Sequence, residues 1–276
     1  MIRSVLVVAT ALLALTSCSS ADDSTTPPPS SSPSASPTST TSTAPADAAR
    51  PSVPKVGQCY RLSFEQALAP TTRTNPSKCR GATAQTAYVG TIDALVDGHL
   101  LAVDSDRVQA SIARTCPREV ASYVGASERD LRLSMVRPVW FSPTLAESDA
   151  GAMWFRCDVV SLASDKDLAP LSSMKGALAR GGDRYAVCGT TKPDDPRFAR
   201  VACAQKHAWR AIDSYDIGGD GYPGAAAMRA AGEDVCKSIA EKLAEDSLDF
   251  EWALDWPTKE QWGNGQRWGL CWAPEG

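Results

Sequence analysis

Two segments of this chain repeat one pattern. Residues 143–157 read PTLAESDAGAMWFRC, and residues 257–271 read PTKEQWGNGQRWGLC. Five residue types match without a gap: Pro143/Pro257, Thr144/Thr258, Gly151/Gly265, Trp154/Trp268 and Cys157/Cys271. Because Trp and Cys are rare, finding both in one register indicates an internal duplication.

The cysteines follow the same duplication. Each half has four, at intervals of 20, 37 and 41 residues in the first half and 15, 33 and 35 in the second. An even number of cysteines in an exported chain indicates a disulfide framework. A zinc site is the alternative, but zinc ligands usually lie two to four residues apart. The eight are Cys59, Cys79, Cys116, Cys157, Cys188, Cys203, Cys236 and Cys271.

Eight cysteines allow 105 pairings, and three remain if each half closes on itself in the same way. We favour bonds from first to second and from third to fourth cysteine, because they close the shortest loops. On the chain-entropy model each bond stabilises its domain by about 3–4 kcal/mol. The favoured bonds are Cys59–Cys79, Cys116–Cys157, Cys188–Cys203 and Cys236–Cys271.

Hydrophobic periodicity predicts one helix in each half, with the third cysteine on its apolar stripe. The first stripe is Val108, Ile112, Cys116, Val120 and Val124, and the second is Met228, Val235, Cys236, Ile239 and Leu243. Pro117 should kink the first helix or start a second one.

Short strand-like segments surround each helix, and FEWALDW (250–256) alternates so that Phe250, Trp252, Leu254 and Trp256 share a face. We therefore predict an α+β fold of two tandem disulfide-bonded repeats, each roughly β-β-α-β-β. Repeat 1 spans 55–162, a linker spans 163–182, and repeat 2 spans 183–276.

The first 17 residues have the features of a signal peptide. Arg3 is followed by an apolar run from Val5 to Leu15, which is too short to span a bilayer. The run ends in Leu15-Thr16-Ser17-Cys18, which resembles a bacterial lipobox, in which the cysteine is lipidated and becomes the mature N-terminus. An ordinary signal peptide with an incidental cysteine is the alternative. We predict lipidation of Cys18 by groups that include palmitate.

Residues 18–54 are predicted to form a disordered tether after the lipidated cysteine. Ser, Thr and Pro make up 25 of the 36 residues from 19 to 54, and Val53 is the only large aliphatic residue among them. Such a segment cannot bury a core.

The set of motifs resembles the septum formation domain of actinobacterial envelope proteins. The resemblance rests on the lipobox, Gly57-x-Cys59-Tyr60, Cys203-x3-His207-Ala208 and the closing Pro-Thr-x(6)-Gly-x-x-Trp-x-x-Cys. It covers about 55–276 and is closer in the second half, since Thr83 aligns with His207 and Ser148 with Trp262. The resemblance implies a location in the envelope and a link to cell division, and it carries over no catalytic residue.

His207 is the one histidine in a motif, so it is the candidate for a catalytic or binding role. The structural alternative is a histidine bonded within its strand region, which Thr83 at the aligned position favours, because Thr cannot act as a base near neutral pH. The chain has no G-x-S-x-G, and paired cysteines leave no thiol nucleophile.

Trp262 is the second candidate binding residue. It lies in a Gly-rich segment and has Ser148 as its counterpart, so we expect it to be exposed, ready to stack on a glycan or contact a partner protein. Trp154 and Trp268 are expected in the core. The stretch 213–224 faintly resembles a calcium-binding loop through Asp216, Asp220 and Gly221. An EF-hand loop that started at Asp216 would have Gly218 and Ala227 at two ligand positions, so no metal or cofactor is predicted.

The 276 residues carry a net charge of −4 and no cluster of Lys and Arg, which argues against nucleic-acid binding. We therefore expect a lipid-anchored binding protein on the extracytoplasmic face of the cell membrane, and not an enzyme. Its expected partner is an envelope or division protein or a glycan. The alternative is an envelope hydrolase or transferase that uses His207 with an acidic partner.

Overall fold

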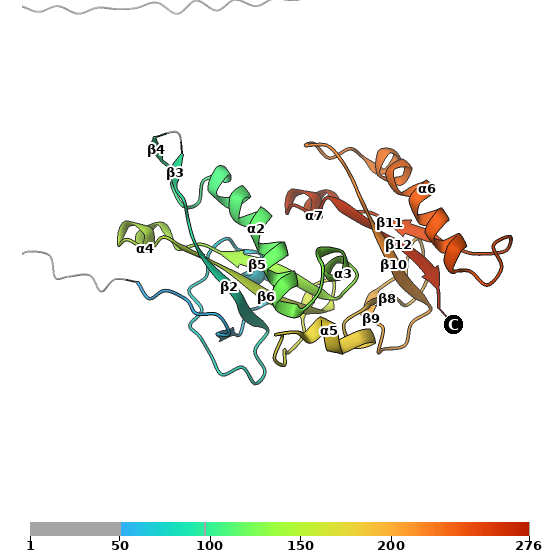
Figure 1. The fold of residues 1–276 in the computed structure, drawn as a ribbon, viewed down its shortest axis with the longest axis horizontal. Helices are drawn as coiled ribbons and strands as arrows, with labels where there is room; N and C mark the ends of the chain where they lie inside the picture. Colours follow the sequence, from blue (N-terminus) through green and yellow to red (C-terminus); the bar gives the residue numbers. More distant parts are fainter. Residues whose placement is uncertain (1–50, 97, 276) are drawn as a thin grey trace, which may run out of the picture. The chain divides into compact units, whose positions relative to one another are not determined.

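The computed structural model describes residues 51–96 and 98–275 (Figure 1). The predicted signal peptide, Cys18 and the tether up to residue 50 lie outside the described residues. Among the described residues, none of the helices combines the length and the apolar character that crossing a membrane requires.

The first repeat forms an antiparallel sheet in the order β1-β2-β6-β5, with β7 paired to β6. The long helix α2 (Asp106–Val124) packs on β2, β5 and β6. The strands are β1 (Cys59–Tyr60), β2 (Ala84–Thr91), β5 (Val136–Phe141), β6 (Trp154–Ser164) and β7 (Asp167–Leu168).

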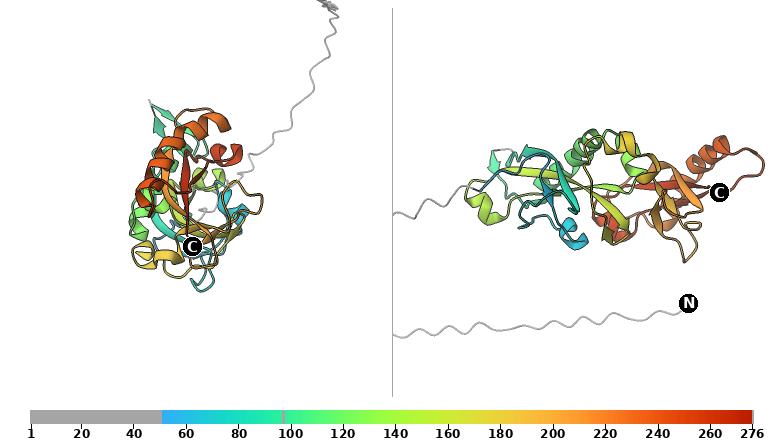
Figure 2. Two further views of the ribbon diagram at one scale, coloured as in Figure 1. Left: turned by 90° about the vertical axis from the view of Figure 1, so that its right-hand side faces the viewer. Right: turned by 90° about the horizontal axis from the view of Figure 1, so that it is seen from below.

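The second repeat forms an antiparallel sheet in the order β11-β12-β10-β8-β9. Helix α6 (Ala225–Leu243) packs on β10, β11 and β12 (Figure 2). The strands are β8 (Val187–Gly189), β9 (Arg200–Ala202), β10 (Trp209–Asp216), β11 (Ala253–Asp255) and β12 (Trp268–Pro274).

The two sheets have the same topology, which confirms the duplication. Strands β8, β10, β12 and β11 take the places of β1, β2, β6 and β5. The register agrees too, because Tyr88 pairs with Cys157 in one sheet and Asp213 pairs with Cys271 in the other. A bulge lies next to each of these pairs.

Shorter elements connect these strands and helices. A hairpin of β3 (Leu95–Val96) and β4 (His99–Leu100) follows β2 in the first repeat. The short helices are α1 (Phe64–Leu68), α3 (Glu128–Arg132), α4 (Leu145–Asp149), α5 (Ala177–Gly181), the 3-10 turn η1 (Gly182–Arg184) and α7 (Lys259–Gly263).

Four disulfides have the pairing with the shortest loops. They are Cys59–Cys79, Cys116–Cys157, Cys188–Cys203 and Cys236–Cys271. In each repeat the second bond joins the long helix to an inner strand of the sheet, β6 or β12, and the four cysteines of these two bonds are fully buried. These are the bonds that the sequence analysis favours.

The duplicated segment builds the same short helix and turn in both repeats. Thr144 and Thr258 are the N-caps of α4 and α7, and each forms a capping box with the residue three positions later, Glu147 or Gln261. Gly151 and Gly265 follow with φ angles of +92° and +93°, which side chains with a Cβ rarely adopt. The shared Thr and Gly are therefore backbone requirements of one turn.

The predicted stripe of α2 is confirmed. Of the two alternatives expected at Pro117, a kink or a second helix, the second helix does not form, because α2 continues through Pro117 as one helix. The predicted apolar stripe of α6 is partly wrong. Val235 and Leu243 are exposed, and the buried residues are Met228, Gly232, Cys236 and Ala240. A Cβ on Gly232 would lie 2.5 Å from the ring of Tyr215, so small residues let this helix approach its sheet closely.

The two repeats share a core and a backbone link. Leu133, Met135 and Leu162 of the first repeat pack with a cluster from the second sheet that includes Trp209 and Trp272. The Met135 amide donates to the Tyr185 carbonyl at 2.6 Å, and the Val187 amide donates to the Leu133 carbonyl at 3.0 Å. The second repeat therefore buries one face of its sheet against the first.

The segment 163–182, predicted as a linker, continues the first repeat. Strand β6 extends to Ser164 and pairs with β7. Leu171, Met174 and Ala177 are buried in the core cluster beneath α2. The segment thus contributes apolar side chains to the first repeat instead of only connecting two finished domains.

We predict that Gly265→Ala lowers the free energy of unfolding by about 1–2 kcal/mol, because a Cβ is strained at this φ angle while no atom lies near enough to clash. Gly263→Ala is the matched control, since Gly263 ends α7 without a left-handed φ. Urea denaturation of both variants measures the difference. Equal stability of the two would contradict the backbone explanation for the shared glycine.

Candidate functional site

His207 lies in the loop before β10, and oxygen atoms occupy the positions next to both of its ring nitrogens. Nδ1 is 2.7 Å from the Gln205 carbonyl oxygen, and Nε2 is 3.2 Å from Oε2 of Glu275. Because a carbonyl can only accept, Nδ1 carries a proton and donates to it. Neither nitrogen is left with a free lone pair facing solvent, which a general base requires.

Glu275 connects His207 to an arginine. The Arg210 Nε donates to the carboxylate of Glu275, and Arg210 Nη2 donates to Oδ1 of Asp183 at 2.8 Å. The hydrogen bond from Arg210, followed by the charge of Arg210 and the contact with His207, lowers the pKa of Glu275 below its ordinary value against the effect of burial. The carboxylate is therefore committed to holding β10 and the C-terminal end of β12 together, a structural role.

The hydrogen bonds of the backbone show that Thr83 is not the residue of the first repeat that corresponds to His207. The Thr83 amide donates to the Tyr60 carbonyl, and the Ala208 amide donates in the same way to the Gly189 carbonyl. Tyr60 and Gly189 each follow the first cysteine of their repeat. Thr83 therefore corresponds to Ala208, and the alignment of Thr83 with His207 is wrong by one residue. The loop before β10 is one residue longer than the loop before β2, which alignment on the second cysteines could not show.

The disulfide Cys188–Cys203 lies beside this network. Its two sulfur atoms and a Glu275 carboxylate oxygen lie within 4.8 Å of one another, a spacing that could suit a metal ion. The sulfurs are bonded to each other, however, and only a thiolate sulfur is an effective ligand.

Trp262 is buried, so its predicted role as an exposed binding residue is wrong. Its exposed fraction is 4%, and it packs with Tyr215, Met228 and the Cys236–Cys271 bond. The Arg267 guanidinium carbon lies 4.1 Å from the indole centroid. Trp262 is thus a core residue of the second repeat.

The sequence feature that could have indicated the surroundings of Trp262 is the capping box before it. Thr258-x-x-Gln261 starts α7 and places Trp262 in its last turn, so the segment is a helix and not an irregular Gly-rich loop. The first repeat has a longer connection here, 92–105 against 217–224, and buries Ile92, Ala94 and Val103 from it. In the second repeat, the indole of Trp262 adds apolar volume to the core cluster around Tyr215 and Met228.

The matched tryptophans differ in their surroundings. Trp154 is 8% exposed, as expected for the core. Trp268 is only half-buried, and the guanidinium carbons of Arg132 and Arg137 each lie 5.7 Å from its ring centroid. Both arginines come from the first repeat, so cation–π contacts at Trp268 connect the two repeats.

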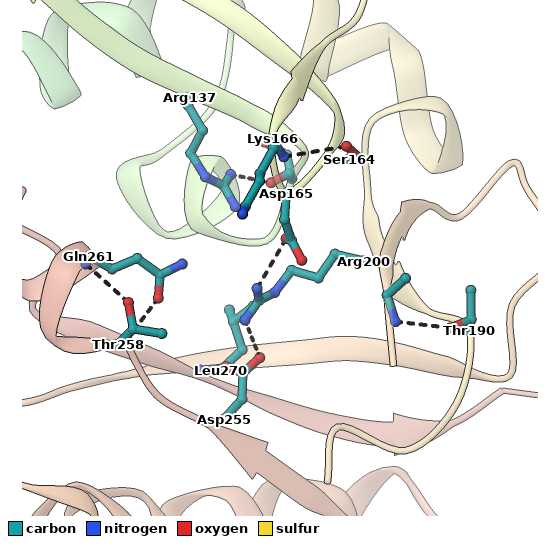
Figure 3. Close-up of polar contacts among 12 residues, drawn as sticks. Arg137, Ser164, Asp165, Lys166, Thr190, Arg200, Asp255, Thr258, Gln261 and Leu270 are labelled. Carbon is teal, nitrogen blue, oxygen red and sulfur yellow. Dashed lines mark hydrogen bonds and ion pairs between the residues drawn. The ribbon is translucent and has the colours of Figure 1, made fainter. Parts of the chain in front are cut away.

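Arg200 forms ion pairs, one of which connects the two repeats (Figure 3). Arg200 of β9 pairs with Asp255 of β11 at 2.6 Å and with Asp165, in the turn between β6 and β7, at 3.4 Å. The Asp255 carboxylate raises the pKa of Arg200. Burial, reinforced by the charge of Arg200, lowers the pKa of Arg137 to about 10. This cluster fixes contacts between the repeats.

A buried ion pair in β6 was not predicted from the sequence. Nε of Arg156 lies 3.2 Å from Oδ2 of Asp158, and both side chains are almost fully buried. The Arg156 guanidinium carbon lies 3.6 Å from the Tyr60 ring centroid and 4.7 Å from that of Phe141. The signal was present in WFRCDVV, where two charges interrupt an apolar strand.

The second repeat shows that the fold does not need this pair. Counted from the paired cysteines Cys157 and Cys271, Leu270 and Trp272 occupy the positions of Arg156 and Asp158. Thr86 donates to Oδ1 of Asp158 at 2.8 Å, but Oδ2 of Asp158 and two nitrogens of Arg156 have no hydrogen-bond partner. Burial raises the pKa of Asp158 to about 6, against the opposing effects of Arg156 and Thr86.

We predict that Trp262→Ala lowers the free energy of unfolding by about 3–5 kcal/mol, because it leaves a cavity in the core. Leu248→Ala, at a side chain that is 95% exposed, is the control and should unfold like the parent chain. Chemical denaturation compares the three proteins. A Trp262→Ala variant as stable as the control would contradict the assignment of Trp262 to the core.

The raised pKa of Asp158 predicts that the contribution of Asp158 to stability becomes more favourable as the pH falls from about 6 to about 4. In that window the folded state binds a proton that the unfolded chain, with an ordinary carboxyl, does not bind. The stabilisation is lost as the pH rises through the folded-state pKa. The unfolding free energy is measured from pH 4 to pH 7 for the parent chain and for Asp158→Asn, and the value of the variant is subtracted from that of the parent at each pH. A difference that does not change with pH would contradict the shifted pKa.

The model of the septum formation family matches the chain twice, over residues 139–251 and over residues 186–274. The second match coincides with the second repeat, and the first runs from within β5 to just past α6. Residues 55–138, to which the sequence resemblance also extends, lie outside both matches. No curated protein and no solved structure shows significant similarity to the chain. Across residues 139–274, the chain belongs to the septum formation family.

Proposed function

We propose that this protein is a lipid-anchored binding protein on the extracytoplasmic face of the cell membrane, where it serves septum formation. The observation that carries the location is the pairing of all eight cysteines of the described residues in disulfides, since such bonds persist in oxidising compartments. The family match supports the link to septum formation.

The site supports binding over catalysis. His207 uses both ring nitrogens in contacts within the protein, and the eight cysteines of the described residues carry no free thiol. The contact of His207 with Glu275 at 3.2 Å is the observation that favours the alternative, a hydrolase or transferase with a His–acid pair. That alternative needs a nucleophile or an activated water next to Nε2, a position that Glu275 fills.

Membrane anchoring is tested by replacing Cys18. We predict that the parent chain is recovered in the membrane fraction with a mass that includes acyl chains, and that Cys18→Ser is released or remains unprocessed. Two acyl chains are needed for stable attachment. Cys79→Ser, which removes a different cysteine, is the control and should stay membrane-bound. Identical fractionation and mass of parent and Cys18→Ser would refute the anchor.

Binding and catalysis are separated by His207→Gln. The glutamine side chain keeps a donor toward Glu275 but cannot transfer protons near neutral pH. We predict that this variant localises to the septum and captures the same crosslinked partners from intact cells as the parent chain. A variant that folds and still captures those partners, yet fails to complement a deletion strain, would favour the enzyme.

A further inference from the structure

A surface cavity lies beside α5, in the segment that precedes the second repeat. It has a volume of about 230 Å³, and its lining combines two serines, two arginines and a tyrosine with small residues. Since a water molecule occupies about 30 Å³ of liquid, the cavity can hold a group several times that size. The polar lining residues are Ser172, Ser173, Arg180, Arg184 and Tyr185.

Contacts within the protein position the first arginine of this cavity. Nη2 of Arg180 donates to the Lys175 carbonyl oxygen at 2.7 Å. The guanidinium also lies against Gly176, because a Cβ built there would be 2.6 Å from Nη1. Gly176 has a φ angle of +63°, which favours glycine. The turn at Lys175 and Gly176 therefore holds Arg180 in one place.

An aromatic ring positions the second arginine. The guanidinium carbon of Arg184 lies 5.3 Å from the ring centroid of Tyr185. Tyr185 is itself buried and packs against Gly181, where a Cβ would lie 2.4 Å from the ring. A guanidinium stacked on a ring keeps the N–H groups at its edge available for an acceptor.

Within the part of the chain that the structure describes, no carboxylate neutralises the positive charge of this cavity. Across residues 51–96 and 98–275, no carboxylate forms an ion pair with Arg180 or Arg184. The nearby carboxylate of Asp183 is bonded to Arg210 at 2.8 Å. Two uncompensated guanidinium groups therefore line one cavity in a protein with a net charge of −4.

We propose that this cavity binds a phosphate group. Guanidinium groups form paired N–H···O bonds with tetrahedral oxyanions, and the hydroxyls of Ser172 and Ser173 are further donors at the same cavity. Because the hydrogen bond to the Lys175 carbonyl already restrains Arg180, this arginine loses less side-chain freedom on binding. The phosphate group belongs to a lipid headgroup or to a soluble phosphate ester. This inference is independent of the proposed septal function.

The test is calorimetric titration of the full chain with inorganic phosphate at constant ionic strength. We expect saturable binding that the double variant Arg180→Gln/Arg184→Gln weakens at least tenfold. The matched control is Arg73→Gln/Arg114→Gln, which removes two exposed charges outside the cavity. Absence of binding, or an equal loss in both double variants, would overturn the site.

A second pair of variants separates the site from general attraction to positive charge. Gly176→Ala keeps every charge but forces Arg180 to move, so it should weaken phosphate binding. Gly182→Ala also strains a left-handed position, with a φ angle of +45°, but no atom lies within 4 Å of its added Cβ. It should keep the parent affinity. Equal affinity of both variants would show that the position of Arg180 does not matter and would refute the built site.

The source of the phosphate is distinguished by two further probes. Glycerol phosphate represents soluble esters, and phosphatidylglycerol vesicles, compared with phosphatidylcholine vesicles, represent anionic headgroups. Vesicle binding that depends on phosphatidylglycerol and is lost in Arg180→Gln/Arg184→Gln assigns the site to lipid. Binding of glycerol phosphate without such vesicle binding assigns it to a soluble ester. Vesicle binding that the double variant retains would contradict a lipid role for the cavity.

Discussion

Each repeat depends on the disulfide that joins its long helix to an inner strand of its sheet. Cys116–Cys157 and Cys236–Cys271 are fully buried between α2 and β6 and between α6 and β12. A sheet of short strands with one helix buries little apolar surface, and such small cores are commonly completed by disulfides. The bond holds the helix over the sheet, and residues such as Val120 or Met228 then complete the packing around it.

The sheet faces that point away from the long helices have different roles in the two repeats, although the backbones of the two sheets correspond. In the second repeat this face carries Leu270 and Trp272 and packs against Met135 of the first repeat. In the first repeat the corresponding face carries Arg156 and Asp158, enclosed by Tyr60 and Phe141. Burying a charged pair without full hydrogen bonding costs stability. The duplication has therefore given one repeat a docking face and the other a buried electrostatic pair.

Arginine side chains lie both near His207 and beside α5, but their charges have different partners in the two places. At His207, Glu275 and Arg210 satisfy one another, so the charges hold strands together. Beside α5, Arg180 and Arg184 are held by a carbonyl and a ring, which leaves their charges for an external anion. Whether an arginine contacts a carboxylate of the protein, more than its residue type, decides whether it belongs to a structural cluster or to a binding site.

The sequence alone determined the duplication, the α+β class and the disulfide pairing that the structure contains, because paired rare residues and short loops leave few alternatives. It also placed Trp154 in the core and the stripe of α2 against the sheet. Only the tertiary structure decided that Trp262 is buried, that His207 corresponds to Ala82 rather than Thr83, and that 163–182 completes the first core. These outcomes depend on contacts between residues distant in the chain, on a one-residue loop difference, and on which sheet face another repeat covers.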